Sequence, residues 1–238
     1  GVIAGSGGVT KTDTGTLTLS GDNTYTGDTT INAGILQVDG DAIDDASNVV
    51  LAAAAGATLD LNNNTETIGS LSGGSLLGGN VTLGTGTLIT GDIGNDTYGG
   101  EISGSGGLTK AGSGQLTLTG TNTYTGTTTI NDGTLSIDAD NNLGAAPGAV
   151  NPNHLTLNGG TLEVTDNVTL DPNRGLAVAA GGGTFDVDAG TTLSYGGVIA
   201  GSGGVTKTDT GTLTLSGDNT YTGDTTINAG ILQVDGDA

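Results

Sequence analysis

Few residues in this 238-residue chain have side chains that could carry out chemistry on their own. The chain has no cysteine, one histidine (His154) and four basic residues, which are Lys11, Lys110, Arg174 and Lys207. The absence of cysteine excludes disulfides and thiol nucleophiles. A zinc site or a histidine-based catalytic group needs partners that the chain lacks, so we expect His154 to be an exposed loop residue in a turn-like cluster.

Carboxylates are numerous, with 25 Asp and Glu residues and a formal net charge of −21. Glycoside hydrolysis needs two facing carboxylates, but Glu66, Glu101 and Glu163 are far apart in the sequence, and only pairs of Asp leave this chemistry open. Parallel β-helices include polysaccharide lyases and hydrolases, which is an analogy of fold alone. The three lysines recur at one repeat position, which indicates architecture rather than a single active site. We therefore expect no enzyme activity and no catalytic residues.

Calcium is the alternative to a chain without cofactors. Residues 39–45 and 138–142 each bring several Asp or Asn side chains close together. Neither segment has the twelve-residue calcium loop that ends in Glu, and the nonapeptide calcium repeat is missing. Asp and Asn at corners usually form turns, so we expect no metal-binding or cofactor-binding residues here.

The acidic balance also limits the partners. A surface this negative repels nucleic acid, whose binding needs Lys and Arg to neutralise phosphates, and it repels anionic lipid. No apolar run approaches the ~20 residues of a membrane span, and there is no initiator Met or signal peptide. We expect neither nucleic-acid binding nor membrane insertion of this segment, and we expect that it comes from a longer chain because it begins in mid-pattern.

Internal repeats organise the elements that would position these residues. Residues 197–238 are identical to residues 1–42, and a diverged copy between them, at an offset of 99, shares 26 of the 42 positions. We expect one continuous solenoid segment over residues 1–238. Its parts would be repeat unit A at 1–98, a diverged unit B at 99–196, and the start of a second unit A at 197–238.

Short alternating segments predict β-strands. Residues 16–19 alternate Thr and Leu, and corners rich in Gly, Asn and Asp, such as residues 20–23 and 32–34, separate one strand from the next. No window has a helical period, so we expect essentially no helix. An antiparallel sandwich is one arrangement of such strands, but tandem identity, aliphatic inward positions and Thr-rich outward positions favour a parallel coil. At ~20–25 residues per turn, the chain would make about ten turns over ~50 Å.

Tyrosines and threonines recur with the motif. Tyr25, Tyr124 and Tyr221 lie in Asn-Thr-Tyr-Thr-Gly, while Tyr98 and Tyr195 precede Gly-Gly. A row of exposed tyrosines could stack on sugars, but we favour tyrosines that fill the repeat. Outward threonines avoid the repulsion of roughly 0.9 kcal/mol that like charges would have, even in water, at the ~4.8 Å spacing between turns.

These motifs resemble a known family. Gly5-Ser-Gly-Gly-Val-Thr-Lys11, Gly15-Thr-Leu-Thr-Leu-Ser-Gly21, Asn23-Thr-Tyr-Thr-Gly27 and Thr29-Thr-Ile-Asn-Ala-Gly34 resemble the autotransporter-associated β-strand repeat, also called the passenger-associated transport repeat. The copies at 104–137 and 201–234 match it too. The resemblance implies a right-handed parallel β-helix in the exported passenger of a large bacterial surface protein. It also implies an association with secretion and adhesin-like stalks, and no catalytic residues.

We therefore expect a structural segment of a bacterial cell-surface or secreted protein, acting as a stiff, elongated stalk or an extracellular fibre element. Its expected partners are further identical repeats or other copies stacked head to tail. A second possibility is an adhesin that binds glycans or other cells through its Thr- and Tyr-rich face. A third is a β-helix polysaccharide lyase or hydrolase.

Overall fold

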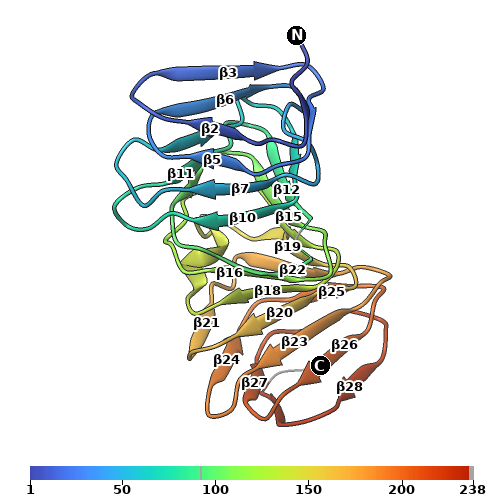
Figure 1. The fold of residues 1–238 in the computed structure, drawn as a ribbon. Helices are drawn as coiled ribbons and strands as arrows, with labels where there is room; N and C mark the ends of the chain where they lie inside the picture. The colour runs from blue at the N-terminus through green and yellow to red at the C-terminus, as the bar shows by residue number, and fades with distance from the viewer. Residues whose placement is uncertain (92, 236–238) are drawn as a thin grey trace.

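The chain forms a coil of short strands stacked in parallel (Figure 1). The computed structural model describes residues 1–91 and 93–235. In this part of the chain every pairing between two named strands is parallel, and the helical structure is one four-residue 3-10 turn, η1 (Asp140–Leu143). No described helix is long and apolar enough to cross a membrane. The expected all-β solenoid of parallel turns is confirmed.

The first side of the coil is a sheet of eleven strands, whose successive partners are 19 to 27 residues apart. Its ten ladder steps correspond to roughly 48 Å of axis. In order, the strands are β2 (Val9–Lys11), β5 (Thr29–Ile31), β7 (Asn48–Leu51), β10 (Ser70–Gly73), β13 (Asn95–Tyr98), β16 (Gln115–Leu118), β18 (Thr134–Ile137), β20 (Thr161–Val164), β23 (Gly183–Val187), β26 (Val205–Thr208) and β28 (Thr225–Ile227).

The chain passes from this sheet to a second side and then to a third. The second side is a five-stranded sheet early in the chain, with β3 (Thr16–Ser20), β6 (Ile35–Asp39), β8 (Thr58–Asp60), β11 (Asn80–Thr82) and β14 (Ile102–Ser103). Late in the chain it is a four-stranded sheet, with β21 (Val168–Leu170), β24 (Thr192–Tyr195), β27 (Thr212–Leu215) and β29 (Ile231–Val234).

The third side is a seven-stranded sheet. Its strands are β9 (Glu66–Ile68), β12 (Thr87–Thr90), β15 (Gly107–Lys110), β17 (Thr128–Ile130), β19 (Asn151–Leu157), β22 (Arg174–Val178) and β25 (Ile199–Gly201). A two-stranded sheet pairs β1 (Ala4–Gly5) with β4 (Thr24–Tyr25). Each turn of the coil therefore presents up to three strands around a shared interior.

The interior consists of aliphatic columns, because in-register strands place like residues above one another. On the first side, Leu116, Leu135, Leu162 and Phe185 are successive Cα partners, and all four side chains are buried. Outward positions of the same sheet form a threonine ladder through residues 134, 161, 184, 206 and 226. The expected division into aliphatic interior and Thr-rich exterior is confirmed on this side.

Identical residues in two contexts show how much this burial depends on stacking. Ile31 is fully buried, whereas Ile227, its counterpart in the copy at 197–238, is 52% exposed because no described turn follows it. The reverse holds at the other end, where Leu17 is 38% exposed and its counterpart Leu213 is fully buried. A turn is covered by its neighbours rather than by its own side chains.

The three copies of the motif do not all lie on the same side of the coil. Its lysine strand is β2 in the first copy and β26 in the last, both in the eleven-stranded sheet, but β15 of the middle copy belongs to the seven-stranded sheet. The middle copy is therefore turned by one side relative to the other two. From β2 to β26 the sheet makes nine ladder steps, so 196 residues return the motif to the same side.

The longest ladder step, 27 residues from Thr134 to Thr161, contains η1 and an excursion beyond it. Arg174, which lies on the following turn, binds this excursion. Its guanidinium donates to both carboxylate oxygens of Asp140, through Nε at 2.8 Å and NH2 at 3.0 Å, and to the main-chain oxygens of Leu143 at 2.9 Å and Gly144 at 2.6 Å. Arg174 is 1% exposed, so these bonds replace the water that its charge loses.

We expect Arg174→Met to lower the free energy of unfolding by roughly 3 kcal/mol, because it removes the guanidinium that donates to the Asp140 carboxylate and to the main-chain oxygens of Asp140, Leu143 and Gly144. Chemical denaturation measures the change. Asp138→Asn is the matched control, since that exposed carboxylate lies in the same excursion and makes no contact with the guanidinium. Equal stabilities of the two variants would contradict this account.

Candidate functional site

The lysine of each motif is a structural clamp. Lys11 takes the last inward position of β2, and its ammonium reaches the corner beyond the strand. There it donates to the main-chain oxygens of Thr12 at 2.8 Å, Asp13 at 2.5 Å and Ala33 at 3.1 Å. Ala33 belongs to the next turn, so the ammonium joins two turns at a corner where carbonyl groups converge.

The other two lysines bind the corner after their own strands. Lys207 is fully buried and donates to the main-chain oxygens of Thr208 and Asp209, the latter at 2.7 Å. Lys110, also fully buried, donates to the main-chain oxygen of Gly112, which replaces the aspartate of the other copies. The clamp thus works without a neighbouring Asp side chain, which supports the interpretation of the recurring lysines as architecture.

The tyrosines are also interior residues, so they cannot form a sugar-stacking row on the surface. Tyr25, Tyr98, Tyr124 and Tyr195 are at most 2% exposed, and the Tyr124 hydroxyl lies 2.6 Å from the Thr128 hydroxyl. Burial raises the pKa of Tyr124 to about 12. Tyr221 is half-buried, because the turn that would cover it is not among the described residues. The expectation that tyrosines fill the repeat is confirmed.

A recurring asparagine has a role that the sequence did not indicate. Asn23 reads as a turn residue, but it is 6% exposed, accepts from the amide of Ile3 at 2.8 Å and donates to the carbonyl of Ala42 at 2.6 Å. Asn122 bridges its two neighbouring turns in the same way. It accepts from the amide of Ile102 on the preceding turn and donates to the carbonyl of Asn142 on the following turn. The sequence carried one sign of this role, because an Asn recurs two residues before the tyrosine of each motif.

His154 is not the exposed loop residue that we expected. It lies on β19, is 1% exposed, and its Nδ1 is 3.4 Å from NH1 of Arg174. Burial lowers the pKa of His154, and the guanidinium lowers it further, so the ring is neutral and accepts from the arginine. The following turn covers the residue, and a turn-like local sequence cannot show that.

The two acidic segments considered for calcium form turns and contacts within the chain. In the first, the Asp44 carboxylate accepts from the amide of Ala46 at 3.0 Å. In the second, Asp140 is paired with Arg174, and the Asn142 side chain accepts from the amides of Asp138 and Ala139. These partners support the interpretation of both segments as corner formers.

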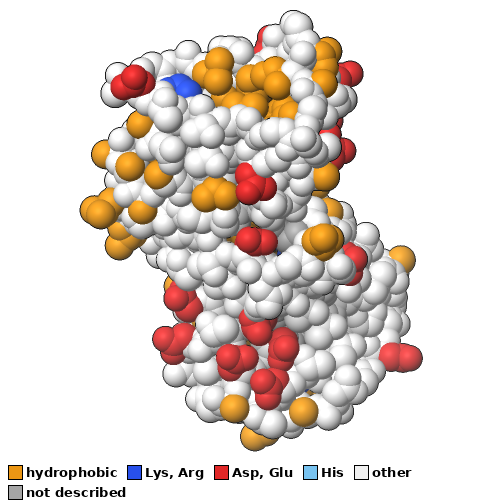
Figure 2. Space-filling model, viewed as in Figure 1, with side chains coloured by type: hydrophobic (Ala, Val, Ile, Leu, Met, Phe, Trp, Pro, Cys, Tyr) orange, Lys and Arg blue, Asp and Glu red, His pale blue; other side chains and the backbone are white. Residues whose placement is uncertain are grey.

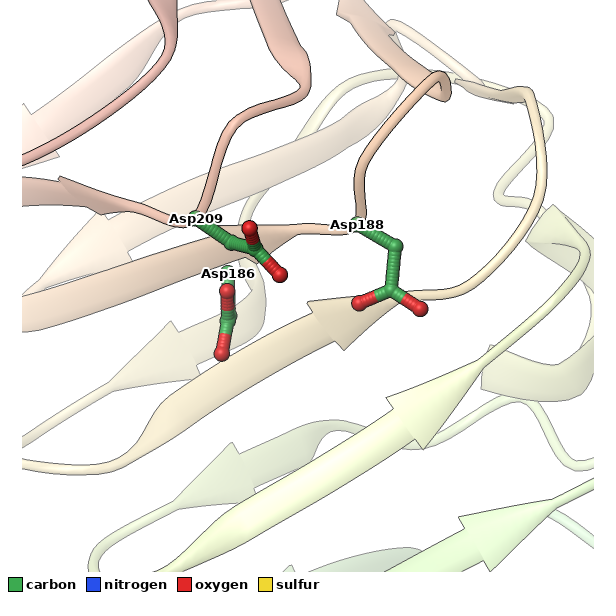
Figure 3. A group of neighbouring side chains, drawn as sticks. All are labelled: Asp186, Asp188 and Asp209. Carbon is green, nitrogen blue, oxygen red and sulfur yellow. The ribbon is translucent and has the colours of Figure 1, made fainter.

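A different group, Asp186, Asp188 and Asp209, has carboxylate oxygens within 4.8 Å of one another (Figure 3). Asp186 and Asp188 lie at the end of β23, and Asp209 lies in the corner after β26. Mutual repulsion adds to burial in raising the pKa of Asp188. The Lys207 ammonium attracts the carboxylates of Asp186 and Asp209, so the chain supplies a cation beside the group.

The charged groups on the surface are almost all anionic. Lys11, Lys110, Arg174 and Lys207 are all at least nine-tenths buried, so none of them offsets the carboxylates outside. The face in Figure 2 shows many Asp and Glu side chains and a single small basic patch. The surface is acidic because the chain has 25 Asp and Glu residues, and the burial of its four basic side chains adds to this.

Glu66 is the exception among the carboxylates, because it is fully buried without a cationic partner among the described residues. Its oxygens accept from the amides of Ala42 at 3.0 Å and Ile43 at 2.6 Å. Burial raises its pKa to about 7, against the effect of the two amides, and the charges of Asp41 and Asp45 raise it further. The three Glu residues lie on different turns and form no facing pair.

We expect Glu66 to make stability depend on pH. Its pKa in the folded chain, about 7, is above the unfolded value of 4.5, so its contribution is complete below pH 4.5 and is lost as the pH rises through 7. The loss amounts to about 3 kcal/mol. Free energies of unfolding between pH 4.5 and 8 should show this slope in the original chain and not in Glu66→Gln. Glu101→Gln, at a partly exposed carboxylate, should keep the slope, and a slope that persists in Glu66→Gln would refute the assignment.

Comparisons with known proteins agree with this architecture. The family model of the passenger-associated-transport-repeat matches residues 9–38, 108–137 and 205–234, which contain the lysine clamp and the motif tyrosine of each copy. No solved structure matches the chain.

Two curated proteins match this chain over a small part of their own length. The adhesin BmaC autotransporter of Brucella suis biovar 1 (strain 1330) is 42% identical over 252 residues, which cover 98% of this chain and 7% of that protein. An extracellular serine protease of Serratia marcescens is 53% identical over 49 residues, which are 21% of this chain and 4% of that protein. The chain therefore carries three repeats of the passenger-associated-transport-repeat family.

Proposed function

We propose that this chain is a stiff shaft segment in the passenger of a bacterial cell-surface or secreted protein. The observation that carries the proposal is that each recurring lysine and tyrosine serves the coil itself. The lysines clamp corners, and the tyrosines fill the interior. A repeated motif whose polar groups are used inward leaves a uniform rod with an anionic, threonine-rich exterior.

The adhesin autotransporter that resembles this chain supports a place on the cell surface, and the chain spans 7% of its length. In such a protein we infer that the coil continues into further turns, because identical residues are buried wherever a neighbouring turn covers them. The activity of the whole protein would then reside in parts displayed by the shaft or at singular positions along it.

We also infer that the segment is not an enzyme. The lysines and the arginine, which could act as bases in a polysaccharide lyase, hold carbonyl and carboxylate oxygens in the interior. The three glutamates lie on separate turns, and His154 is buried against a guanidinium. These contacts support a structural role for each group.

The shaft can be tested by lengthening it. Because residues 197–238 repeat residues 1–42, fusing another copy of residues 43–238 after Ala238 continues the sequence pattern without a break. We expect the added nine ladder steps to lengthen the particle by about 43 Å at constant cross-section, since each step adds ~4.8 Å. Small-angle X-ray scattering and negative-stain images measure both dimensions.

A fused particle that is thicker rather than longer would contradict the shaft, as would two bodies joined by a flexible point. Thermal unfolding is a useful control. The fused chain should melt at or above the temperature of the original chain, because it contains the same two ends and more internal turns.

A further inference from the structure

One loop stands clear of the coil. After η1 the chain leaves the stacked turns over residues 145–150, which we call the 145–150 loop, and it returns at β19. Ala146, Gly148, Ala149 and Val150 are exposed, and Val150 is 65% exposed. A Cβ atom at Gly148 would have no heavy atom within 4 Å, so no other part of the described chain covers the loop at this point.

The backbone of this loop makes few hydrogen bonds. The amide of Ala145 donates to the carbonyl of Tyr124 at 2.9 Å, and the carbonyl of Pro147 accepts from the side chain of Asn173 at 3.1 Å. The amides of residues 146 and 148–150 have no acceptor in the described ranges. An extended peptide is bound through its main-chain hydrogen bonds, so a backbone whose groups are unpaired and exposed is open to a protease.

The side chains of the loop indicate the class of protease. Ala149 and Val150 are small and aliphatic, and a serine protease with a small S1 pocket accepts Ala before the bond that it cuts. The bond before Pro147 is a poor substrate because proline has no N–H group. The amide of Asn151 donates to the carbonyl of Asn173 at 2.9 Å, which restrains the bond after Val150. These conditions favour the Ala149–Val150 bond.

Another exposed corner, residues 52–57, is also rich in alanine but is held by its own hydrogen bonds. The amide of Ala54 donates to the carbonyl of Ala52 at 2.8 Å, and the amide of Ala57 donates to that of Ala54 at 3.1 Å. This corner would have to open before a protease could bind its backbone. Small side chains alone therefore do not distinguish the 145–150 loop, whereas its unpaired backbone does.

Proteases that cut after basic residues have no accessible site on the folded chain. All four basic side chains are at most 7% exposed, and they are Lys11, Lys110, Arg174 and Lys207. Cleavage after any of them requires the coil itself to open, which is rare in a stable fold. The chain should therefore distinguish sharply between proteases of the two specificities.

A cut in this loop leaves the coil joined. β17 and β18 precede the loop, and they pair with β19 and β20 after it through three and four Cα pairs. The guanidinium of Arg174 also binds Asp140, Leu143 and Gly144 on the other side of the cut. These contacts do not depend on the covalent continuity of residues 145–150.

We propose that the 145–150 loop is a site of limited proteolysis, at which a serine protease with a small S1 pocket hydrolyses the Ala149–Val150 bond while the two pieces remain one coil. Water adds across the peptide bond, so Ala149 gains a carboxylate and Val150 gains an ammonium group. The shaft thus carries a point where the chain is severed and the rod stays whole.

The test treats the folded 238-residue chain with pancreatic elastase and, separately, with trypsin. We expect elastase to give two fragments, with a new N-terminus at Val150 by mass spectrometry, that elute together at the size of the uncut chain. Trypsin should leave the folded chain uncut over the same time, and it should cut the chain once this has been unfolded by heat, which shows that the enzyme is active.

A substitution in the loop gives a second measurement. Ala149→Asp should slow cleavage by elastase at least tenfold, because a carboxylate does not suit a small apolar pocket, and it should leave the melting temperature unchanged. Ala53→Asp is the matched control, since it places the same charge on an exposed alanine of the 52–57 corner and should be cut as fast as the original chain.

The proposal is overturned if elastase cuts first at another bond, or if Ala149→Asp is cut as fast as the original chain. It is also overturned if trypsin cuts the folded chain as fast as elastase does, or if the two fragments separate on the column without denaturant.

Discussion

The structure depends on the parallel, in-register pairing of each turn with the next. The two copies of one sequence isolate this dependence, because Ile31 and Ile227 have identical sequence surroundings and differ in whether a turn covers them. The same holds for polar groups. The ammonium of Lys11 and the side chain of Asn23 each donate to a carbonyl on the next turn, that of Ala33 and that of Ala42, so these hydrogen bonds exist only when the coil is stacked. Local strand propensity alone would leave these groups unpaired.

Much of the fold could be predicted from the sequence because the coil is nearly one-dimensional. The alternation at residues 16–19 fixes which side chains face inward, and repetition of the motif implies that identical neighbours stack. The lysines were correctly interpreted as architecture because they recur. Their contacts were not predictable in detail, since one of the three carbonyls that bind Lys11, that of Ala33, comes from a corner twenty-two residues away.

Residues that occur only once were predicted poorly, because no repeat of their surroundings shows where they lie in the coil. His154 and Arg174 appear once each, in segments rich in turn residues, and their burial follows from the length of one irregular step rather than from any local pattern. Asp96 belongs to the same class. Its alternation with Tyr98 predicts an inward position, but Asp96 is only half-buried, and β10 and β13 share a single Cα pair, Gly73–Tyr98, which no local pattern indicates. Repetition of the motif made the regular turns predictable, but it gave no information about the irregular turns.

The rotation of the motif between copies has a consequence for what the exterior can display. Any side chain that recurs at the 99-residue offset moves to another side of the rod, whereas one that recurs after 196 residues returns to the same side nine steps further on. In a longer array of this pattern, any surface feature that occurs once in 196 residues would lie along a single line parallel to the axis, at intervals of about 43 Å. A flat opposing surface could then engage several such features at once, and their individually weak contacts would add through multivalency.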